Sequence, residues 1–231
     1  MKREVLYHLS EDEFSLDSPG PATPEQGGPW VVQIFRSITS DSAVMSQDRL
    51  HCLHRKYGSY VDNSIQRQYV QLIRNAAAFI YIENQYFLGS AYAWVRDTDT
   101  LCHHTIPIEL TEKIIGKILA DEPFHVYVTI PMYPEGDPAS TPSQEILRWQ
   151  SRTMECMYRR IYRALEQVGS ARHPTDYLSF YCLGKREGPE DVPEDLSDPE
   201  PGSGAELVRV SLRHPIYVHS KAGSWAWNVR F

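Results

Sequence analysis

The sequence predicts an α/β protein whose sheet is largely parallel and flanked by helices. Strand-like and helix-like stretches alternate along most of the chain, the order that produces parallel strands joined by crossover helices. One strand-like stretch, residues 79–82, is apolar on both faces, as expected for an internal parallel strand. The chain has 231 residues, 42% of them hydrophobic, which is enough to form a buried core.

The elements follow one another in a regular order. The first predicted strand is Trp30–Arg36. In the next element, Asn63 and Gln66 form a predicted capping box, and apolar residues recur at helical spacing behind it. After the strand at 79–82 the pattern repeats, with a helix from Thr105 to Ala120, a strand at 124–130, a helix opened by a capping box at Thr141 and running to Val168, and a strand at 177–183.

Two segments differ in composition from the rest. Residues 1–29 contain few large apolar side chains, so we expect a flexible N-terminal segment. Residues 187–206 contain eight acidic residues, four prolines and no lysine or arginine, which predicts a disordered acidic loop rather than an acidic binding site. Strand structure is expected to return at 207–210 and again at 216–219.

The end of the chain carries a candidate site for phosphoryl transfer. The apolar run at 216–218 leads into His219 and Lys221, and residues two apart on a strand face the same side. An imidazole can attack phosphorus or protonate a leaving oxygen, and a fixed ammonium neutralises the non-bridging oxygens. A single His-x-Lys pattern also arises by chance, so its weight depends on the rest of the chain.

Glu83, Asn84 and Gln85 are candidate substrate-binding residues. They follow the strand at 79–82, at the edge where α/β sheets place their sites. An alternative is that they only hydrogen-bond neighbouring loops and helices. Two clusters of His and Cys, at 51–54 and 102–104, have no second ligand pair at zinc-finger spacing, so we expect no metal site.

Charge and hydropathy restrict the partners. The net charge of −7 and the pI near 5.7 argue against a sequence-independent nucleic-acid binder. The four cysteines are scattered, and we find neither a signal peptide nor an apolar run long enough to cross a bilayer. These features predict a cytoplasmic protein whose membrane contact is peripheral.

Five stretches carry a resemblance, and in chain order they are Trp30–Ile38, Ile80–Phe87, Ile130–Gly136, Gln144–Trp149 and Ile216–Lys221. In this order they resemble hallmark segments of the eukaryotic phospholipase D family, particularly the plant type. The last of them resembles the start of the family's second His-x-Lys-x4-Asp motif. The resemblance implies that residues 30–221 are the C-terminal catalytic half of that fold, one incomplete half of a pseudo-symmetric α/β pair.

The resemblance also implies a chemistry. In this family one histidine attacks the phosphodiester to form a phosphohistidine, and the other protonates the leaving alcohol. Carried over to this sequence, His219 is the general acid and base, and Lys221 clamps the phosphate of phosphatidylcholine-type phospholipids, which yield phosphatidic acid and a free headgroup. No cofactor is evident in this chain; calcium is implied only for the full-length enzyme, through a lipid-binding module that has no counterpart here.

The sequence departs from the family pattern in three ways. Ala226 stands where the second motif has its aspartate, residues 222–231 form an atypical tail, and we find no first motif. We therefore expect a partial catalytic domain, inactive alone and dependent on the missing catalytic half in trans. One alternative is an inactive truncated isoform that binds a membrane or a full-length partner. A second, disfavoured by the acidic charge, is a dimeric nuclease with one motif per subunit.

Overall fold

We describe the fold from a computed structural model, which defines residues 33–38, 62–89, 91, 94, 104–188 and 199–225. The chain divides into two compact units, Met1–Ile34 and Phe35–Phe231. The secondary structure described below belongs to the second unit. The predicted flexible segment 1–29 lies outside the described residues.

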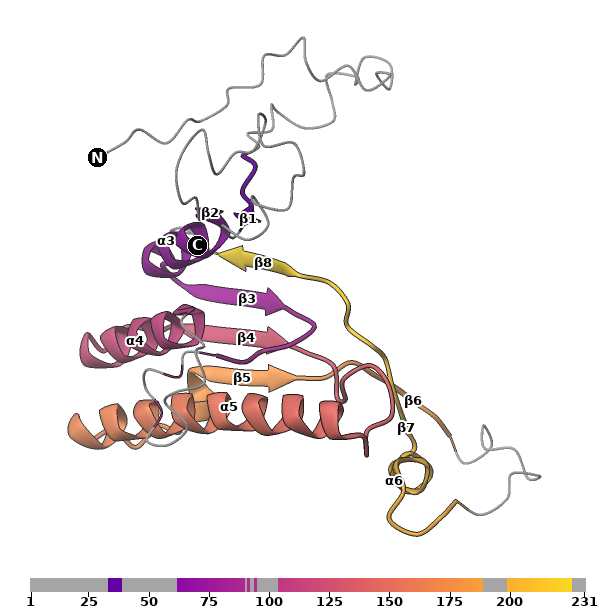
Figure 1. The fold of residues 1–231 in the computed structure, drawn as a ribbon. Helices are drawn as coiled ribbons and strands as arrows, with labels where there is room; N and C mark the ends of the chain where they lie inside the picture. The colour runs from indigo at the N-terminus through magenta and orange to yellow at the C-terminus, as the bar shows by residue number, and fades with distance from the viewer. Residues whose placement is uncertain are drawn as a thin grey trace, which may run out of the picture. The chain divides into compact units, whose positions relative to one another are not determined.

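A four-stranded mixed sheet organises the second unit (Figure 1). Its strands are β3 (Phe79–Glu83), β4 (His125–Thr129), β5 (Leu178–Tyr181) and β8 (Ala222–Trp225), in the order β5-β4-β3-β8. Strands β3, β4 and β5 are parallel, whereas β8 pairs antiparallel with β3. The predicted α/β fold with a mainly parallel sheet is confirmed, and β3 is internal as expected.

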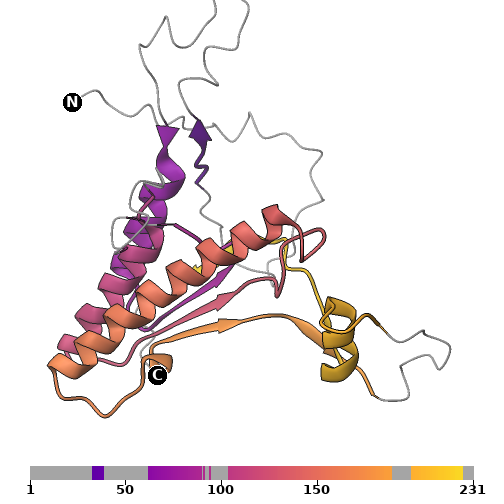
Figure 2. The ribbon, with the colours of Figure 1, turned by 60° about the horizontal axis from the view of Figure 1, so that its bottom comes forward.

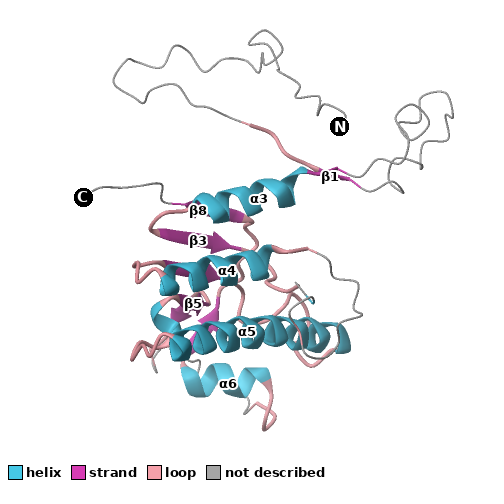
Figure 3. Cartoon of the chain, turned by 90° about the vertical axis from the view of Figure 1, so that its left-hand side faces the viewer, coloured by secondary structure: helices cyan, strands magenta, loops and turns pink. Residues whose placement is uncertain are grey.

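Three long helices lie next to one another along the sheet (Figure 3). They are α3 (Ser64–Asn75), α4 (Ile106–Leu119) and α5 (Thr141–Gln167). Each precedes or follows a parallel strand, as the crossover connection requires. Their inner residues and one face of the sheet form a single core, which includes Ile73, Leu110, Ile114 and Ile161 from the helices and Ile80, Val126, Val128 and Leu178 from the strands.

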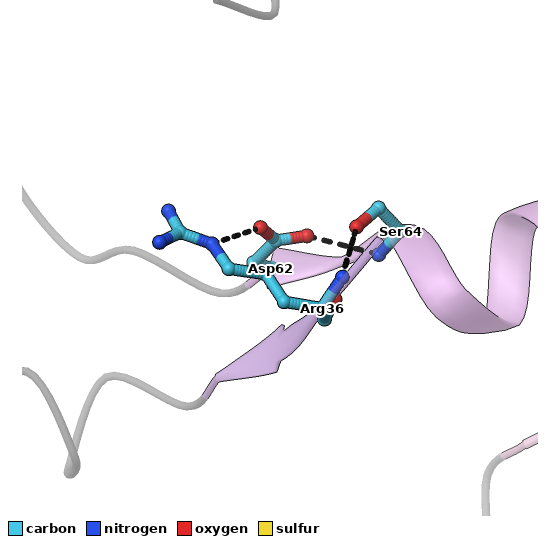
Figure 4. Close-up of polar contacts among 3 residues, drawn as sticks. All are labelled: Arg36, Asp62 and Ser64. Atoms are coloured by element: carbon cyan, nitrogen blue, oxygen red, sulfur yellow. Dashed lines mark hydrogen bonds and ion pairs between the residues drawn. The ribbon is translucent and has the colours of Figure 1, made fainter. Parts of the chain in front are cut away.

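The first turns of the helices differ from the predicted capping boxes. Asn63 is the N-cap residue of α3, but its side chain makes no capping hydrogen bond. Asp62 caps instead, because its Oδ1 accepts from the Ser64 N–H at 2.9 Å while its Oδ2 pairs with Arg36 Nε at 2.9 Å (Figure 4). Helix α5 begins at Thr141 behind the N-cap Ser140, one residue earlier than predicted, and its N-cap side chain also makes no capping bond.

The strand predicted at Trp30–Arg36 is wrong in its described part, and a short strand follows it instead. Residues 33–36 have no regular structure, and β1 (Ser37–Ile38) pairs antiparallel with β2 (Asp62–Asn63). The Ser64 hydroxyl donates to the Arg36 carbonyl and accepts from the Arg36 N–H, which ties this short pair to the start of α3 (Figure 4).

A small ribbon and a helix lie beyond the carboxyl ends of the parallel strands (Figures 1 and 2). Strand β6 (Gly184–Arg186) pairs antiparallel with β7 (Arg213–Pro215), and α6 (Gly204–Ser211) lies between them in the sequence. The predicted strand at 207–210 is therefore wrong. Ser203 Oγ accepts from the Glu206 N–H, and this cap favours a helix over the strand preference of the valines.

The predicted strand at 216–219 is also wrong, since these residues have no regular secondary structure between β7 and β8, although the Ile216 N–H still donates to the Leu183 carbonyl at 3.0 Å. Helix α6 begins inside the segment predicted to be a disordered acidic loop, of which residues 189–198 lie outside the described part. Within the part of the chain that the structure describes, no helix is long and apolar enough to cross a membrane. Cys156 and Cys182 are free thiols.

Candidate active site

The segment that carries His219 and Lys221 runs past the carboxyl end of β3 and then enters β8 (Figure 1). One side chain of the segment is buried: Val218 is only 3% exposed, whereas Tyr217 and His219 on either side of it are exposed. The buried Val218 side chain thus anchors an extended segment whose polar residues point outward. The side chains of His219 and Lys221 lie close together, with 3.4 Å between Lys221 Nζ and His219 Nδ1, in a segment without regular secondary structure rather than in a strand.

Lys221 is held by neutral oxygen atoms. Its Nζ donates to Gln85 Oε1 at 2.7 Å and to the His219 carbonyl at 2.7 Å, and it lies 3.4 Å from His219 Nδ1. Among the residues that the structure describes, no carboxylate pairs with this ammonium. The positive charge is therefore fixed in position but not neutralised, which is the condition under which a lysine attracts an anion.

Gln85 connects this lysine to an aromatic residue of the same segment. Its Nε2 donates to Tyr217 Oη at 2.8 Å and lies 3.4 Å from Tyr86 Oη. With the amide oxygen directed at Lys221 and the amide nitrogen at Tyr217, one side chain fixes both ends of the stretch 217–221. A hydrogen bond to Tyr217, together with partial burial, raises the pKa of Tyr86.

Glu83 accepts a hydrogen bond from Ser220, the residue between His219 and Lys221. Ser220 Oγ donates to Glu83 Oε2 at 2.5 Å, and Tyr81 Oη donates to Glu83 Oε1 at 2.6 Å. These two bonds, that from Ser220 first, hold the pKa of the Glu83 carboxyl below its usual value, and the bond to Glu83 raises the pKa of Tyr81. Glu83 therefore positions the backbone that carries His219 and Lys221 and contacts neither of their side chains.

Asn84 makes only local structural hydrogen bonds among the contacts described, which is the alternative to substrate binding that the sequence left open. Its N–H donates to the Thr129 carbonyl at 3.0 Å, and its side-chain Nδ2 donates to the Tyr86 carbonyl. Both bonds hold the turn after β3. Of the three residues predicted together, the structure brings Glu83 and Gln85 to the site and gives Asn84 a local structural role.

Helix α5 holds the loop that carries these residues. The Phe87 N–H donates to Gln150 Oε1, and the Gly89 N–H donates to Thr153 Oγ1, both at 3.1 Å. Gln150 and Thr153 are 8% and 1% exposed. On the other side of the loop, His104 Nε2 lies 2.6 Å from the Leu88 carbonyl.

Sequence reasoning missed Gln150, Thr153, His104 and Tyr217. Gln150 and Thr153 could have been found, because both fall on the inward face of α5 between the apolar residues Leu147 and Met157, where a polar side chain needs a buried partner. His104 and Tyr217 give no such signal, since neither is a buried polar residue on the inward face of a helix.

Several predictions fall outside the described residues. Ala226 and the rest of the tail at 226–231 are among them, as are the His/Cys cluster at 51–54 and two members of the cluster at 102–104. The inference that the first motif is absent is wrong, because His54-Arg55-Lys56 is a second His-x-Lys. Val61 stands where the complete motif has aspartate, so the first motif is incomplete rather than absent. This stretch also lies outside the described part.

The described residues do not fit a metal ion. Nowhere in the described ranges do three or more His, Cys, Asp or Glu side chains gather closely enough to bind one. Calcium requires six to eight oxygen ligands, several of them carboxylates. The Glu83 carboxylate at this site already accepts hydrogen bonds from two hydroxyl groups.

Comparison with known proteins places the chain in a family. The family model described as "Phospholipase D" matches residues 2–223. Phospholipase D delta of Arabidopsis thaliana is 50% identical over 200 residues, which are 83% of this chain and 22% of that protein. Phospholipase D alpha 1 of Vigna unguiculata is 41% identical over 230 residues, and the same enzyme of Oryza sativa subsp. japonica is 42% identical over 232, in each case 95% of this chain and 28% of the relative.

The chain belongs to the phospholipase D family. The predicted resemblance is thereby confirmed. The chain spans about a quarter of the length of these curated relatives.

Proposed function

We propose that this chain contributes one half of a phospholipase D active site, in which Lys221 binds the phosphate of a phosphatidylcholine-type phospholipid. One observation carries the proposal: the Lys221 ammonium is held by Gln85 and the His219 carbonyl without a carboxylate among the described residues. A phosphodiester oxygen can take the place of the long contact to His219 Nδ1, and a charge-assisted bond of this kind contributes about 1.5–3 kcal/mol.

In the proposed reaction His219 is the general acid and base. A nucleophilic histidine, supplied by a second half-site, attacks phosphorus; the P–N bond forms as the P–O bond to the headgroup alcohol breaks, and His219 gives its proton to that alcohol. His219 then takes a proton from water, which attacks phosphorus and breaks the P–N bond. The products are the free headgroup and phosphatidic acid.

His219 suits this role because it is exposed and next to a fixed cation. Lys221 Nζ faces Nδ1 of the ring, so Nε2 remains the nitrogen available for exchange with substrate. The weak point is the orientation of the ring: the sequence has Ala226 where the family motif has an aspartate to orient it, and removal of one member of such a group typically lowers the rate by about 10³-fold or more.

We therefore propose that the chain alone is inactive and acts with a second half-site in trans, at the surface of a membrane on its cytoplasmic side. Ala226 also favours one other function, that of an inactive family member that binds a membrane or a full-length partner without catalysis.

A headgroup-release assay on phosphatidylcholine vesicles separates these functions. The purified chain is tested alone and mixed with a chain that carries the other His-x-Lys-x4-Asp half. Release only in the mixture, abolished by His219→Gln, supports the half-site. Robust headgroup release by the chain alone refutes dependence on a second half-site. If the mixture is folded and associated but releases no headgroup, the result favours the inactive family member that only binds.

Phosphate binding is measured independently of turnover. We expect a soluble phosphodiester, glycerophosphocholine, to shift the NMR resonances of His219 and of the Lys221 side chain. Lys221→Met should weaken this binding about tenfold or more, because one charge-assisted bond is lost. Lys113→Met, which removes an ammonium that donates to the Arg74 carbonyl on the helical side of the sheet, is the matched control and should leave binding unchanged.

A further inference from the structure

A serine and a histidine form a hydrogen-bonded pair on the face of the sheet that points away from the helical core. Ser179 lies in β5 and His125 in β4, with 3.0 Å between Ser179 Oγ and His125 Nε2. Val126, Val128 and Leu178 of the same two strands belong to the core. Because side chains alternate along a strand, Ser179 and His125 project from the opposite face, where both are part-buried and reachable from solvent.

The histidine is held in the tautomer that a general base requires. His125 Nδ1 lies 2.9 Å from the Asp176 carbonyl, and a carbonyl oxygen can only accept a hydrogen bond. Nδ1 therefore carries the proton of the neutral ring, and Nε2 presents its lone pair to Ser179 Oγ. Ser179 Oγ also lies 3.3 Å from the Thr175 carbonyl. That contact is longer, so the imidazole nitrogen is the nearer acceptor for the hydroxyl proton.

The ring of the histidine is fixed in orientation as well as in tautomer. Its two nitrogens are bonded to different groups, and the ring of Tyr127 stacks on it with 4.1 Å between centroids and 23° between planes. A nucleophile within hydrogen-bond reach of a base, with a third group that orients the base, is the arrangement that activates a serine. Here the Asp176 backbone oxygen takes the place that a carboxylate has in a catalytic triad.

The backbone beside Ser179 provides one donor for a developing oxyanion. The carbonyls of Tyr177 and Tyr181 accept from β4, so the residues of β5 at this spacing, Ser179 included, direct their backbone toward β4. The N–H of Phe180 then points away from β4, and β5 is the edge strand of this sheet. Among the described hydrogen bonds none uses this N–H, which belongs to the residue directly after the serine.

An uncharged aromatic surface lies next to the pair. The rings of Tyr127 and Tyr181 stack at 6.5 Å, and Phe79 packs edge-on against Tyr127 at 6.5 Å. These three side chains are 36%, 50% and 38% exposed. The four strands of the sheet contain no lysine or arginine and one carboxylate, Glu83, which already accepts from two hydroxyl groups. Such a surface favours an apolar, uncharged group over an ion.

We propose that Ser179 and His125 form a second catalytic site, which transfers acyl groups from small uncharged carboxylic esters. Ser179 Oγ attacks the carbonyl carbon as its proton passes to His125 Nε2. The tetrahedral intermediate then breaks its bond to the alcohol, which leaves with that proton. Water next attacks the acyl-serine while His125 takes its proton, and the carboxylic acid leaves as Ser179 recovers its hydrogen. This activity uses neither His219 nor Lys221 and is independent of the proposed phospholipase site.

Hydrolysis of p-nitrophenyl butyrate and labelling by a fluorophosphonate test the site on the full chain. We expect a burst of p-nitrophenol followed by slow turnover, and a single label that peptide mass spectrometry places on Ser179. Ser179→Ala should abolish the label, and Ser179→Ala and His125→Gln should each lower the rate of ester cleavage about tenfold or more. Only one oxyanion donor is present, so the turnover should be well below that of a site with two.

Two variants control for reactions of ordinary surface groups. Ser151 is an exposed serine of α5, and His214 is an exposed histidine of β7; neither has a described hydrogen bond to another side chain. Ser151→Ala and His214→Gln should cleave the ester and take the label as the wild-type chain does. An equal loss of rate in His214→Gln and His125→Gln would show that the cleavage comes from exposed imidazoles in general and would overturn the proposal.

The wild-type chain alone also decides the question, whether or not the variants fold. We expect the ¹⁵N shifts of the His125 ring at neutral pH to show a protonated Nδ1 and an unprotonated Nε2. The opposite tautomer, a label on any residue other than Ser179, or an unchanged rate in a folded Ser179→Ala variant would each overturn the proposal. Failure of this site would leave the glycerophosphocholine shift at His219 intact, so the two sites are tested separately.

Discussion

The bond between Thr153 and Gly89 offers the sharpest test of how the site is supported. Thr153 Oγ1 accepts from the Gly89 N–H at 3.1 Å and donates to the Trp149 carbonyl one turn back in its own helix. Thr153→Val keeps the shape of the side chain and leaves the Gly89 N–H buried without its acceptor. An unsatisfied buried donor costs about 1–3 kcal/mol.

Thr111→Val is the matched control for this substitution. Thr111 is also 1% exposed, and its hydroxyl also donates to the carbonyl four residues back, that of Pro107. Among the described contacts, no backbone N–H donates to this hydroxyl, so Thr111→Val leaves no buried N–H without its acceptor. The two variants therefore differ in one feature, the bond that holds the loop after β3.

Urea denaturation measures the difference. We expect Thr153→Val to lower the midpoint, with an unchanged slope, by an amount equivalent to about 1–3 kcal/mol more than Thr111→Val does. We also expect the NMR resonances of Gln85 and Lys221 to shift in Thr153→Val and not in Thr111→Val. Equal destabilisation by the two substitutions would show that the loop does not depend on α5, and the reasoning would be wrong.

Two more predictions follow from the contacts around the site. Gly89 has φ +130°, and a Cβ there would lie 1.7 Å from His104 Nε2, so Gly89→Ala should destabilise the fold by about 3 kcal/mol or more. The control is Gly136→Ala, at φ +105° with open space around it, which should cost only about 1–2 kcal/mol of backbone strain. Equal destabilisation of the two variants in thermal unfolding would exclude the His104 contact as the cause. The lowered pKa of Glu83 means that its contribution to stability is present above its ordinary value of 4.5 and is lost as pH falls through the lower folded value. The stability difference between the wild-type chain and Glu83→Gln should therefore shrink below about pH 4.5 in a series of urea titrations, and a difference that stays constant or grows with acidity would contradict the assigned bonds.

The sequence alone was sufficient to predict the helices and strands that are specified by neighbouring residues. The helices α3, α4 and α5 and the strands β3, β4 and β5 lie within a few residues of their predicted positions, because each combines a clear apolar period with a proline, glycine or polar boundary. The errors came where two local preferences compete. At 207–210 the valines favour a strand, but Ser203 and Glu206 cap a helix, and the cap satisfies backbone donors that an unpaired strand would leave open.

Residue chemistry and order along the chain were likewise sufficient to select His219 and Lys221 and to identify the family. The spacing of the pair is local, and five ordered segments carry far more specificity than one His-x-Lys. The contacts that form the site were determined by the tertiary structure. Only the fold shows that Gln85 holds Lys221, that Glu83 holds Ser220 and that Asn84 serves its own turn, since these contacts cross more than 130 residues or depend on how the chain turns after β3.

The same division applies to the pair of Ser179 and His125. Their strands were predicted from the sequence, but the sequence cannot say that His125 faces Ser179, because a shift of one residue in register would place the two side chains on opposite faces. Hydrophobic periodicity is encoded in neighbouring residues and is readable from them. Strand register, side-chain pairing and the exposure of a surface depend on contacts between distant segments, and for this protein they were decided only when the chain folded.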